Sequence, residues 1–191
     1  GLAVGVLQSL TANENAQLFS GGKTKDIRVE PLTSFTVGRI QQDYKEGNST
    51  LGAIFTATNR FINDPYLEGL NRNAFTGGID FLTQWKEKKY FLDAKFIGSS
   101  ISGSAGAISN LQISSARYYQ RPDASHVNYD PKRTQLSGQG GNLKIGKGSG
   151  LFRYSEEINW KSTGLELNDV GFMQMADRVE QETEISYFVN K

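Results

Sequence analysis

The sequence predicts an all-β fold, namely a segment of an antiparallel transmembrane β-barrel with about nine or ten strands. Apolar and polar residues alternate over long stretches, as at Phe75, Ile79 and Phe81, between which Thr76 and Asp80 stand. A period of two gives a strand one apolar face and one polar face. Such stretches are longer than most sandwich strands, and short turns alternate with longer loops, as in outer-membrane barrels.

The first half of the chain contains several predicted strands. They are residues 2–11, a segment from Asp26 that Pro31 interrupts and that resumes at 34–44, and residues 50–59, 74–86 and 89–98. Proline marks a bulge or an edge because it cannot donate a ladder hydrogen bond. Gly21-Gly22, Lys45–Asn48 and the charged run Lys86–Lys89 are the predicted turns.

The second half has longer loops between its strands. A Gly/Ser-rich loop is expected at 99–107, a strand at 108–120, a polar loop at 121–133, a hairpin of 134–147 with 151–161, a loop at 162–169 and a last strand region within 170–190. The last region ends in the alternation of Thr183, Ile185 and Tyr187 with glutamates and a serine, which favours a strand there.

Composition narrows the function classes. The 191 residues are expected to form one segment, 1–191, with 37% hydrophobic residues, which suits strands that are apolar on only one face. A net charge of +1 and the lack of a basic aromatic stripe argue against nucleic acid. The absence of cysteine excludes thiolate metal sites and disulfides. Because the chain begins at Gly1, it is expected to be a fragment of a longer protein.

Six short motifs, in this order, carry a resemblance to a known family. They are VEPLT at 29–33, NR at 59–60, NAFTGGIDF at 73–81, RYYQRPDA at 117–124, LSG at 136–138 and LNDVGF at 167–172. Together they resemble the barrel region of an uncharacterised family of Bacteroidetes-type outer-membrane β-barrel proteins. The resemblance implies a full-length protein with an N-terminal domain similar to carbohydrate-binding family nine, which is absent here. That family has no agreed catalytic residues.

Catalytic interpretations are weak. His126, the only histidine, lies beside Ser125 in a polar loop, and a solvated loop histidine is favoured over a triad base. Asp80 and Asp93, with glutamates 156 and 157, could form a glycosidase pair, but lumen-facing charges paired with lysine and arginine are favoured. We therefore predict no catalytic residue and no enzyme activity.

Ligand-binding motifs are equally weak. Asp64 with Glu68, or Asp123 with Asp130, could hold calcium, but turn-forming residues are favoured. The glycine-rich run at 138–141 lacks a following helix, so strand twist and close approach are favoured over a phosphate cradle. No metal site and no cofactor are predicted.

Two sets of side chains are the predicted functional residues. The lumen charges are Arg39, Asp80, Lys86, Asp93, Lys95, Arg153 and Glu157, in an electrostatic role. The aromatic girdle at the membrane interfaces is Tyr44, Trp85, Phe152, Trp160 and Tyr187.

The sequence thus predicts a bacterial outer-membrane protein with a structural, transport or export role in a larger envelope assembly. Its partners are expected to be outer-membrane lipid or lipopolysaccharide and other outer-membrane or periplasmic proteins, and not nucleic acid. Three alternatives stay open. One is a soluble β-sandwich that binds carbohydrate through exposed aromatic side chains, and another is a β-sheet hydrolase on sugars. The third is the ordered part of a barrel that is still being assembled or is held by a partner, since an incomplete barrel exposes strand edges.

Overall fold

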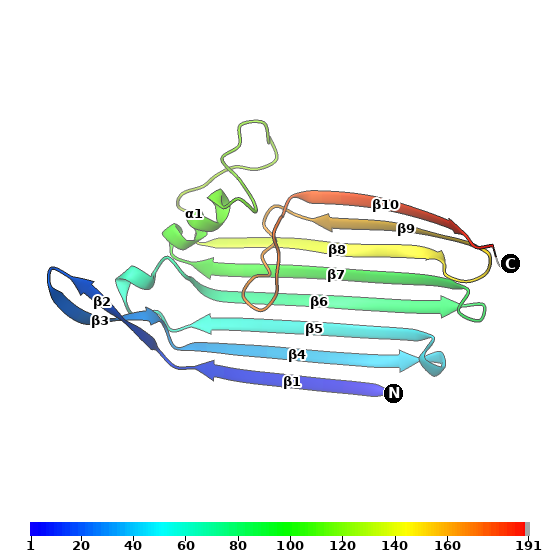
Figure 1. Cartoon of the computed structure of the whole chain (residues 1–191), viewed down its shortest axis with the longest axis horizontal. Coiled ribbons are helices and arrows are strands. Elements are labelled where there is room, and N and C mark those ends of the chain that lie inside the picture. The colour runs from blue at the N-terminus through cyan, green and yellow to red at the C-terminus, as the bar shows by residue number, and fades with distance from the viewer. Residues whose placement is uncertain (190–191) are drawn as a thin grey trace.

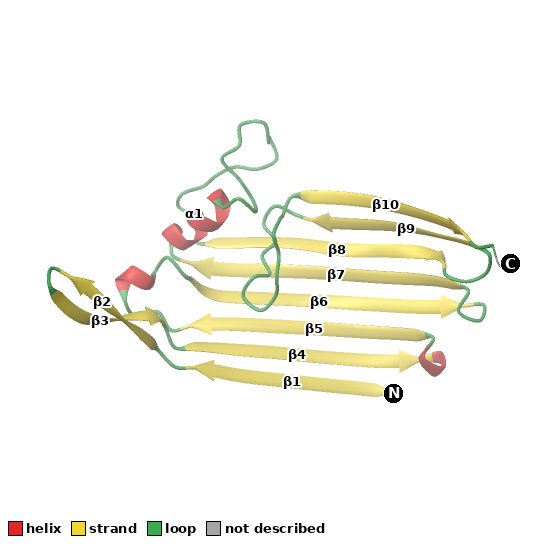
Figure 2. Ribbon diagram, viewed as in Figure 1, coloured by secondary structure: helices red, strands yellow, loops and turns green. Residues whose placement is uncertain are grey.

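A computed structural model describes residues 1–189 of the chain as an almost entirely β structure (Figures 1 and 2). The strands are β1 (Leu2–Thr11), β2 (Glu14–Ser20), β3 (Lys23–Glu30), β4 (Thr33–Tyr44), β5 (Ser49–Arg60), β6 (Asn71–Trp85), β7 (Tyr90–Gly103), β8 (Gln135–Lys147), β9 (Phe152–Lys161) and β10 (Arg178–Tyr187). The helices are α1 (Ala105–Ile113) and two single 3₁₀ turns, η1 (Lys45–Gly47) and η2 (Pro65–Leu67).

Eight strands form one antiparallel sheet in the order β1-β4-β5-β6-β7-β8-β9-β10. Figure 1 shows them side by side as a single broad layer. The all-β antiparallel prediction is therefore confirmed. The sheet is open, with β1 and β10 as its two edges, so closure into a barrel is not part of the described structure.

A separate hairpin of β2 and β3 projects from the sheet between β1 and β4 (Figure 1). Its base is held by an ion pair of Arg28 with Asp64, 2.6 Å from guanidinium nitrogen to carboxylate oxygen. The backbone N–H of Leu32 also donates to the Asn13 side chain at 2.8 Å. A lone two-stranded hairpin is marginal in water, so these contacts with the main sheet matter. β2 was not predicted from the sequence.

The two ends of the sheet differ, as the sequence predicted. At the turn end, strands are joined by short turns at 45–48, 86–89 and 148–151. Lys86, Glu87 and Lys88 all have positive φ, between 50° and 62°, which lets this turn reverse the chain tightly. At the loop end lie the hairpin, residues 61–70 and two long connections, 104–134 and 162–177.

The strand predicted at 108–120 is wrong, because the segment begins as helix α1. Ser104 precedes the helix, and its hydroxyl accepts the backbone N–H of Ala107 at 3.0 Å, which caps the first turn. Ile108 and Gln112, one helical turn apart, are both buried. The flexible loop predicted at 99–107 is also wrong in part, since β7 continues to Gly103.

Cross-strand pairing sorts the side chains onto two faces, because directly paired residues share a face. One face carries Arg39 of β4, Asp80 of β6, Lys95 of β7 and the residues paired with them, and we call it the charged face. The other carries Ile40, Ile79 and their partners, and we call it the apolar face. The buried core lies on the charged face at the loop end, where Ile101 and Leu136 pack against Ile108 of α1.

Candidate functional site

Six of the seven predicted lumen charges share the charged face. The pairings along β4 to β10 place there Arg39, Asp80, Asp93, Lys95, Arg153 and Glu157. The alternation of the sequence was enough to predict this, since a period of two fixes the face of each residue within its strand.

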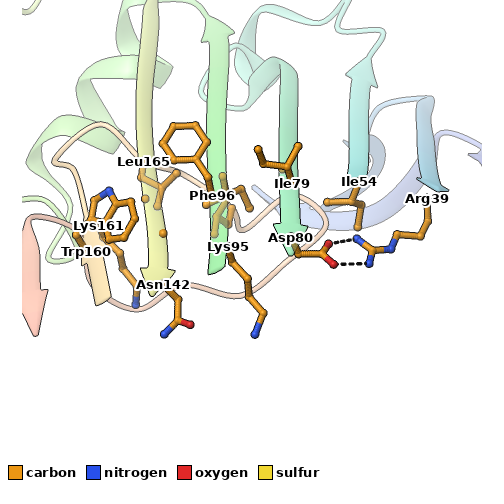
Figure 3. A pocket seen from close by; sticks show the side chains of 15 residues that line it. Arg39, Ile54, Ile79, Asp80, Lys95, Phe96, Asn142, Trp160, Lys161 and Leu165 are labelled. Atoms are coloured by element: carbon orange, nitrogen blue, oxygen red, sulfur yellow. Dashed lines mark hydrogen bonds and ion pairs between the residues drawn. The ribbon is translucent and has the colours of Figure 1, made fainter. Parts of the chain in front are cut away.

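Arg39 and Asp80 form an ion pair across an intervening strand. The Arg39 guanidinium donates to both carboxylate oxygens of Asp80, with one contact of 2.9 Å (Figure 3). It also donates to the side-chain oxygen of Gln41 at 3.2 Å. Between them stands Gly52 of β5, which pairs directly with Asp80. A Cβ at Gly52 would overlap the guanidinium and come within 2.7 Å of the Asp80 carboxylate, so the pair needs glycine there.

A second group of charges lies nearer the other edge of the sheet. Lys144 of β8 contacts Glu157 of β9 at 2.9 Å, and Asn142 and Asn159 donate to the same carboxylate. On β7, Lys95 contacts Asp93 at 3.0 Å. Sequence analysis missed Lys144, although its position on the polar side of the β8 alternation was the signal for it.

Lys86 is the exception among the predicted lumen charges. It lies in the turn between β6 and β7, and its ammonium is 5.7 Å from the centre of the Tyr90 ring. Lys89 approaches the same ring at 5.9 Å. Lys86 therefore belongs to a cation–aromatic rim at the turn end.

The apolar face carries large exposed side chains on every strand of the sheet. Val6 of β1 is 76% exposed, Ile79 of β6 is 58% exposed and Val179 of β10 is 75% exposed. Others on this face are Val4, Ile40, Leu51, Phe55, Phe75, Phe81, Phe96, Leu143, Ile145, Tyr154, Ile158 and Ile185. Toward the loop end the face becomes polar, with Ser34, Asn59, Asn73, Ser100, Ser102, Gln135 and Ser137.

All five predicted girdle residues lie on the apolar face, at two different heights. Tyr44, Trp85, Phe152 and Tyr187 lie near the turn end of their strands. Trp160 lies near the opposite end of β9, where its indole N–H donates to Gln139 at 2.7 Å.

The apolar band runs obliquely across the strands. On β1 it reaches Leu10, near the loop end, whereas the residues in register with Leu10 on β4 to β8 are polar. On β9 the band begins at Phe152, next to the turn end, and extends to Trp160. An apolar band that crosses its strands obliquely is expected when the strands are tilted relative to the direction of the band.

The two long connections fold together onto the charged face at the loop end, and we call residues 104–134 and 162–177 the cap. Figure 1 shows the β9–β10 connection crossing the sheet. It meets β8 at Gly138, where a Cβ would overlap the backbone nitrogen of Leu165. The glycines at 138–141 thus allow close approach of a loop, as the sequence interpretation favoured.

A buried ion pair joins the two parts of the cap. Arg117 and Glu166 contact each other with side chains only 1% and 3% exposed. Arg117 also donates to the Leu165 carbonyl at 2.6 Å, and Glu166 accepts the Asn168 N–H at 2.7 Å. Removing one partner of such a pair would leave an uncompensated buried charge, so the pair fixes how the two loops meet. Neither residue was predicted from the sequence.

His126 takes part in a second link between the two connections of the cap. Its Nε2 lies 2.9 Å and 3.0 Å from the two carboxylate oxygens of Asp177, which also binds Arg121. Burial raises the pKa of Asp177, but the hydrogen bonds from His126 and Arg121 outweigh it, so the pKa is lower than that of a free aspartate. The histidine thus joins two loops, as a structural partner of a carboxylate.

Two of the four acidic residues weighed as calcium ligands have partners in the structure. Asp64 pairs with Arg28, and the Asp130 carboxylate accepts the Lys132 backbone N–H at 2.9 Å. Within residues 1–189 no three His, Cys, Asp or Glu side chains gather closely enough to hold a metal ion. No helix in this part of the chain has the length and apolar character to cross a membrane.

Comparison with known proteins identifies a family without a known function. No curated protein and no solved structure matches the chain. One family model, described as "Domain of unknown function (DUF5916)", matches residues 1–191, so the chain belongs to that family.

Proposed function

We propose that this chain is part of the wall of a bacterial outer-membrane β-barrel, with a structural, transport or export role in a larger envelope assembly. The observation that carries the proposal is the exposed apolar band across all eight strands of the sheet. An exposed apolar surface of this extent needs an apolar environment. Lipid supplies it, and strands can enter lipid because their backbone groups are paired with one another.

The charged face fits the lumen of such a barrel. Its ion pairs, such as Arg39 with Asp80 and Lys144 with Glu157, lie on the side opposite the apolar band. Polar side chains that face a water-filled interior alternate with lipid-facing ones in outer-membrane barrels. In this position they would set the electrostatic field that a passing ion or solute meets.

The cap supports a barrel larger than these eight strands. An eight-stranded barrel has an interior that side chains alone fill. Here the charged face also carries the folded connections 104–134 and 162–177, which need more room. Further strands paired with the free edges of β1 and β10 would provide it and would remove both edges.

The soluble β-sandwich that the sequence left open requires a second sheet packed on the apolar face. Within the described residues that face is uncovered, and the loops that do pack on the sheet lie on its charged face. For this reason we favour the membrane proposal over a soluble carbohydrate-binding module.

The two tryptophans of the chain, Trp85 and Trp160, provide the test. They lie at opposite limits of the oblique apolar band, so each is expected near one membrane interface. In liposomes, lipids brominated high on the acyl chain should quench their fluorescence more strongly than lipids brominated near the chain end. Phe81→Trp, in a background where both tryptophans are replaced by Phe, should show the reverse order.

Leu82→Trp in the same background is the matched control, because Leu82 follows Phe81 in β6 and faces the charged side. It should respond weakly to every brominated lipid. Equal quenching of the Phe81→Trp and Leu82→Trp proteins, or none in either, would contradict the membrane proposal.

A further inference from the structure

A groove lies on the charged face between the sheet and the β9–β10 connection (Figure 3). Its volume is about 450 Å³, within the range of about 300–1,000 Å³ that small-molecule sites have. Most of its lining residues belong to the charged face or to the cap, and no family assignment gives it a role.

The wall of the groove is mostly apolar, although it opens on the charged face. Ile54 of β5 and Ile97 of β7 project from the sheet, and Leu165 and Leu167 face them from the cap. Gly78 lies between Ile54 and Ile97, and Gly140 lies between Ile97 and Lys161, so these two positions add no side chain to the floor of the groove. An apolar trough of this kind would accept an alkyl chain or a similar slender apolar group.

Cations dominate the rim. Arg39, Lys95 and Lys161 line the groove, against the single carboxylate of Asp80. Arg39 is held by Asp80, and Lys95 contacts Asp93. Lys161 makes no ion pair with any residue from 1 to 189, so its ammonium is free to bind an anionic group.

The groove is preformed, because the cap side is held rigidly. Leu165 lies against Gly138 and Gly140, and its carbonyl accepts a hydrogen bond from the buried Arg117. Ile97 and Leu167 pack against the cluster that Leu165 forms with Met173. A ligand would therefore meet a wall that is already in place, which lowers the entropic cost of binding.

We propose that this groove binds a single-chain amphiphile with a carboxylate head, whose alkyl chain lies along Ile54, Ile97 and Leu165 and whose carboxylate pairs with Lys161. The site goes beyond the proposed barrel role and does not depend on it. Complementarity of charge and of apolar surface defines the ligand: the rim selects the anion and the wall selects the chain.

Dodecanoate labelled with ¹³C at its carboxyl carbon is the probe, added to the full chain in whichever of buffer or amphipol keeps it monodisperse. We expect a saturable shift of the carboxyl resonance. Dodecanol should compete at least tenfold more weakly, because it lacks the charge. Lys161→Gln should weaken binding at least fivefold, and Ile54→Trp, which fills the trough, should abolish it.

Two variants act as matched controls. Phe55→Trp makes a similar change one residue along β5 on the apolar face, and Lys132→Gln removes an exposed lysine of the cap. Both should bind dodecanoate as the parent does. Binding that survives both Ile54→Trp and Lys161→Gln, or dodecanol that competes equally, overturns the proposal. Dodecanoate binding without quenching by brominated lipid would remove the membrane role alone.

Discussion

At the scale of single residues, Gly52 decides whether two strands that are not neighbours can share an ion pair. Arg39 on β4 and Asp80 on β6 meet above β5 only because position 52 has no side chain. Both partners are partly exposed, so the pair contributes little to stability.

Gly52→Ala is therefore expected to separate Arg39 from Asp80. A double-mutant cycle with Arg39→Gln and Asp80→Asn should give a coupling energy of about 0.5–1 kcal/mol in the parent and none in the Gly52→Ala background. Denaturant unfolding of each variant measures it. Gly77→Ala is the control, since a Cβ there meets nothing within 4 Å. A coupling energy that persists in the Gly52→Ala protein would show that Gly52 is not required.

The sequence predicted which charges share a face but not which of them touch. Alternation along each strand assigns Asp80 and Lys95 to the polar side without any knowledge of neighbours. The partner of Asp80 depends on the register of three strands, and that register follows from turn lengths and packing. For the same reason the pair of Arg117 and Glu166, which joins two loops, leaves no pattern in the sequence.

At the scale of elements, the cap is held together by contacts between its two connections. Asp177 receives hydrogen bonds from Arg121 and His126, and the neighbouring Ala176 N–H donates to the Ala116 carbonyl at 2.9 Å. The Ala176 amide is thus a local reporter of whether the two connections are joined.

Because the pKa of Asp177 is lowered in the folded protein, its ionised form stabilises the cap. This contribution is complete above the unfolded pKa of about 3.9 and is lost as the pH falls through the lower folded value. Asp177→Asn should therefore reduce the hydrogen-exchange protection of Ala176 severalfold at pH 7. The difference from the parent should vanish once the pH has fallen below the lowered pKa of Asp177 in the folded protein.

Asp123→Asn serves as the control for that experiment, since Asp123 lies in the same cap and is exposed. Its protection profile should match the parent at every pH. Protection of Ala176 that is equal in the parent and in Asp177→Asn at pH 7 would mean that Asp177 does not join the connections.

Strands were easier to predict than the cap, and the reason is physical. A strand with one apolar and one polar face shows a period of two in its own sequence, and β1 has the predicted bounds Leu2–Thr11. In 108–120 the apolar residues Leu111 and Ile113 also alternate with polar ones. The hydrogen bond from the Ala107 N–H to the Ser104 hydroxyl and the burial of Ile108 nevertheless favour a helix. Packing against β7 and β8, rather than the local pattern, decides that segment.

At the scale of the whole molecule, the sheet is a single layer with an apolar side, a charged side and two unpaired edges, β1 and β10, within the described residues. The sequence predicted the all-β antiparallel class because alternation and turns repeat along most of the chain. It could not predict closure, since the number of strands around a ring depends on tilt and stagger, which no single strand encodes.

In the proposed barrel, which further strands close at β1 and β10, the native protein is expected to need detergent for extraction from membranes and to migrate faster on a gel before boiling than after it. A closed barrel resists the detergent until heated, because opening it would expose every backbone group of two edges at once. Gel migration with and without boiling measures this. Release into buffer without detergent, with no heat-dependent shift, would favour the soluble alternative.

The pairing order also has a consequence for how the sheet is made. From β4 to β10 every strand pairs with the one that follows it in the chain, and only β1 reaches past a hairpin to find its neighbour. Four of the six connections from β4 to β10 are ten residues long or shorter, so most of the loops that must close before a strand can pair are short. The sheet can therefore grow one strand at a time from the N-terminal to the C-terminal side. At each step the newest strand has an unpaired edge, which a chaperone would have to shield until the next strand pairs with it.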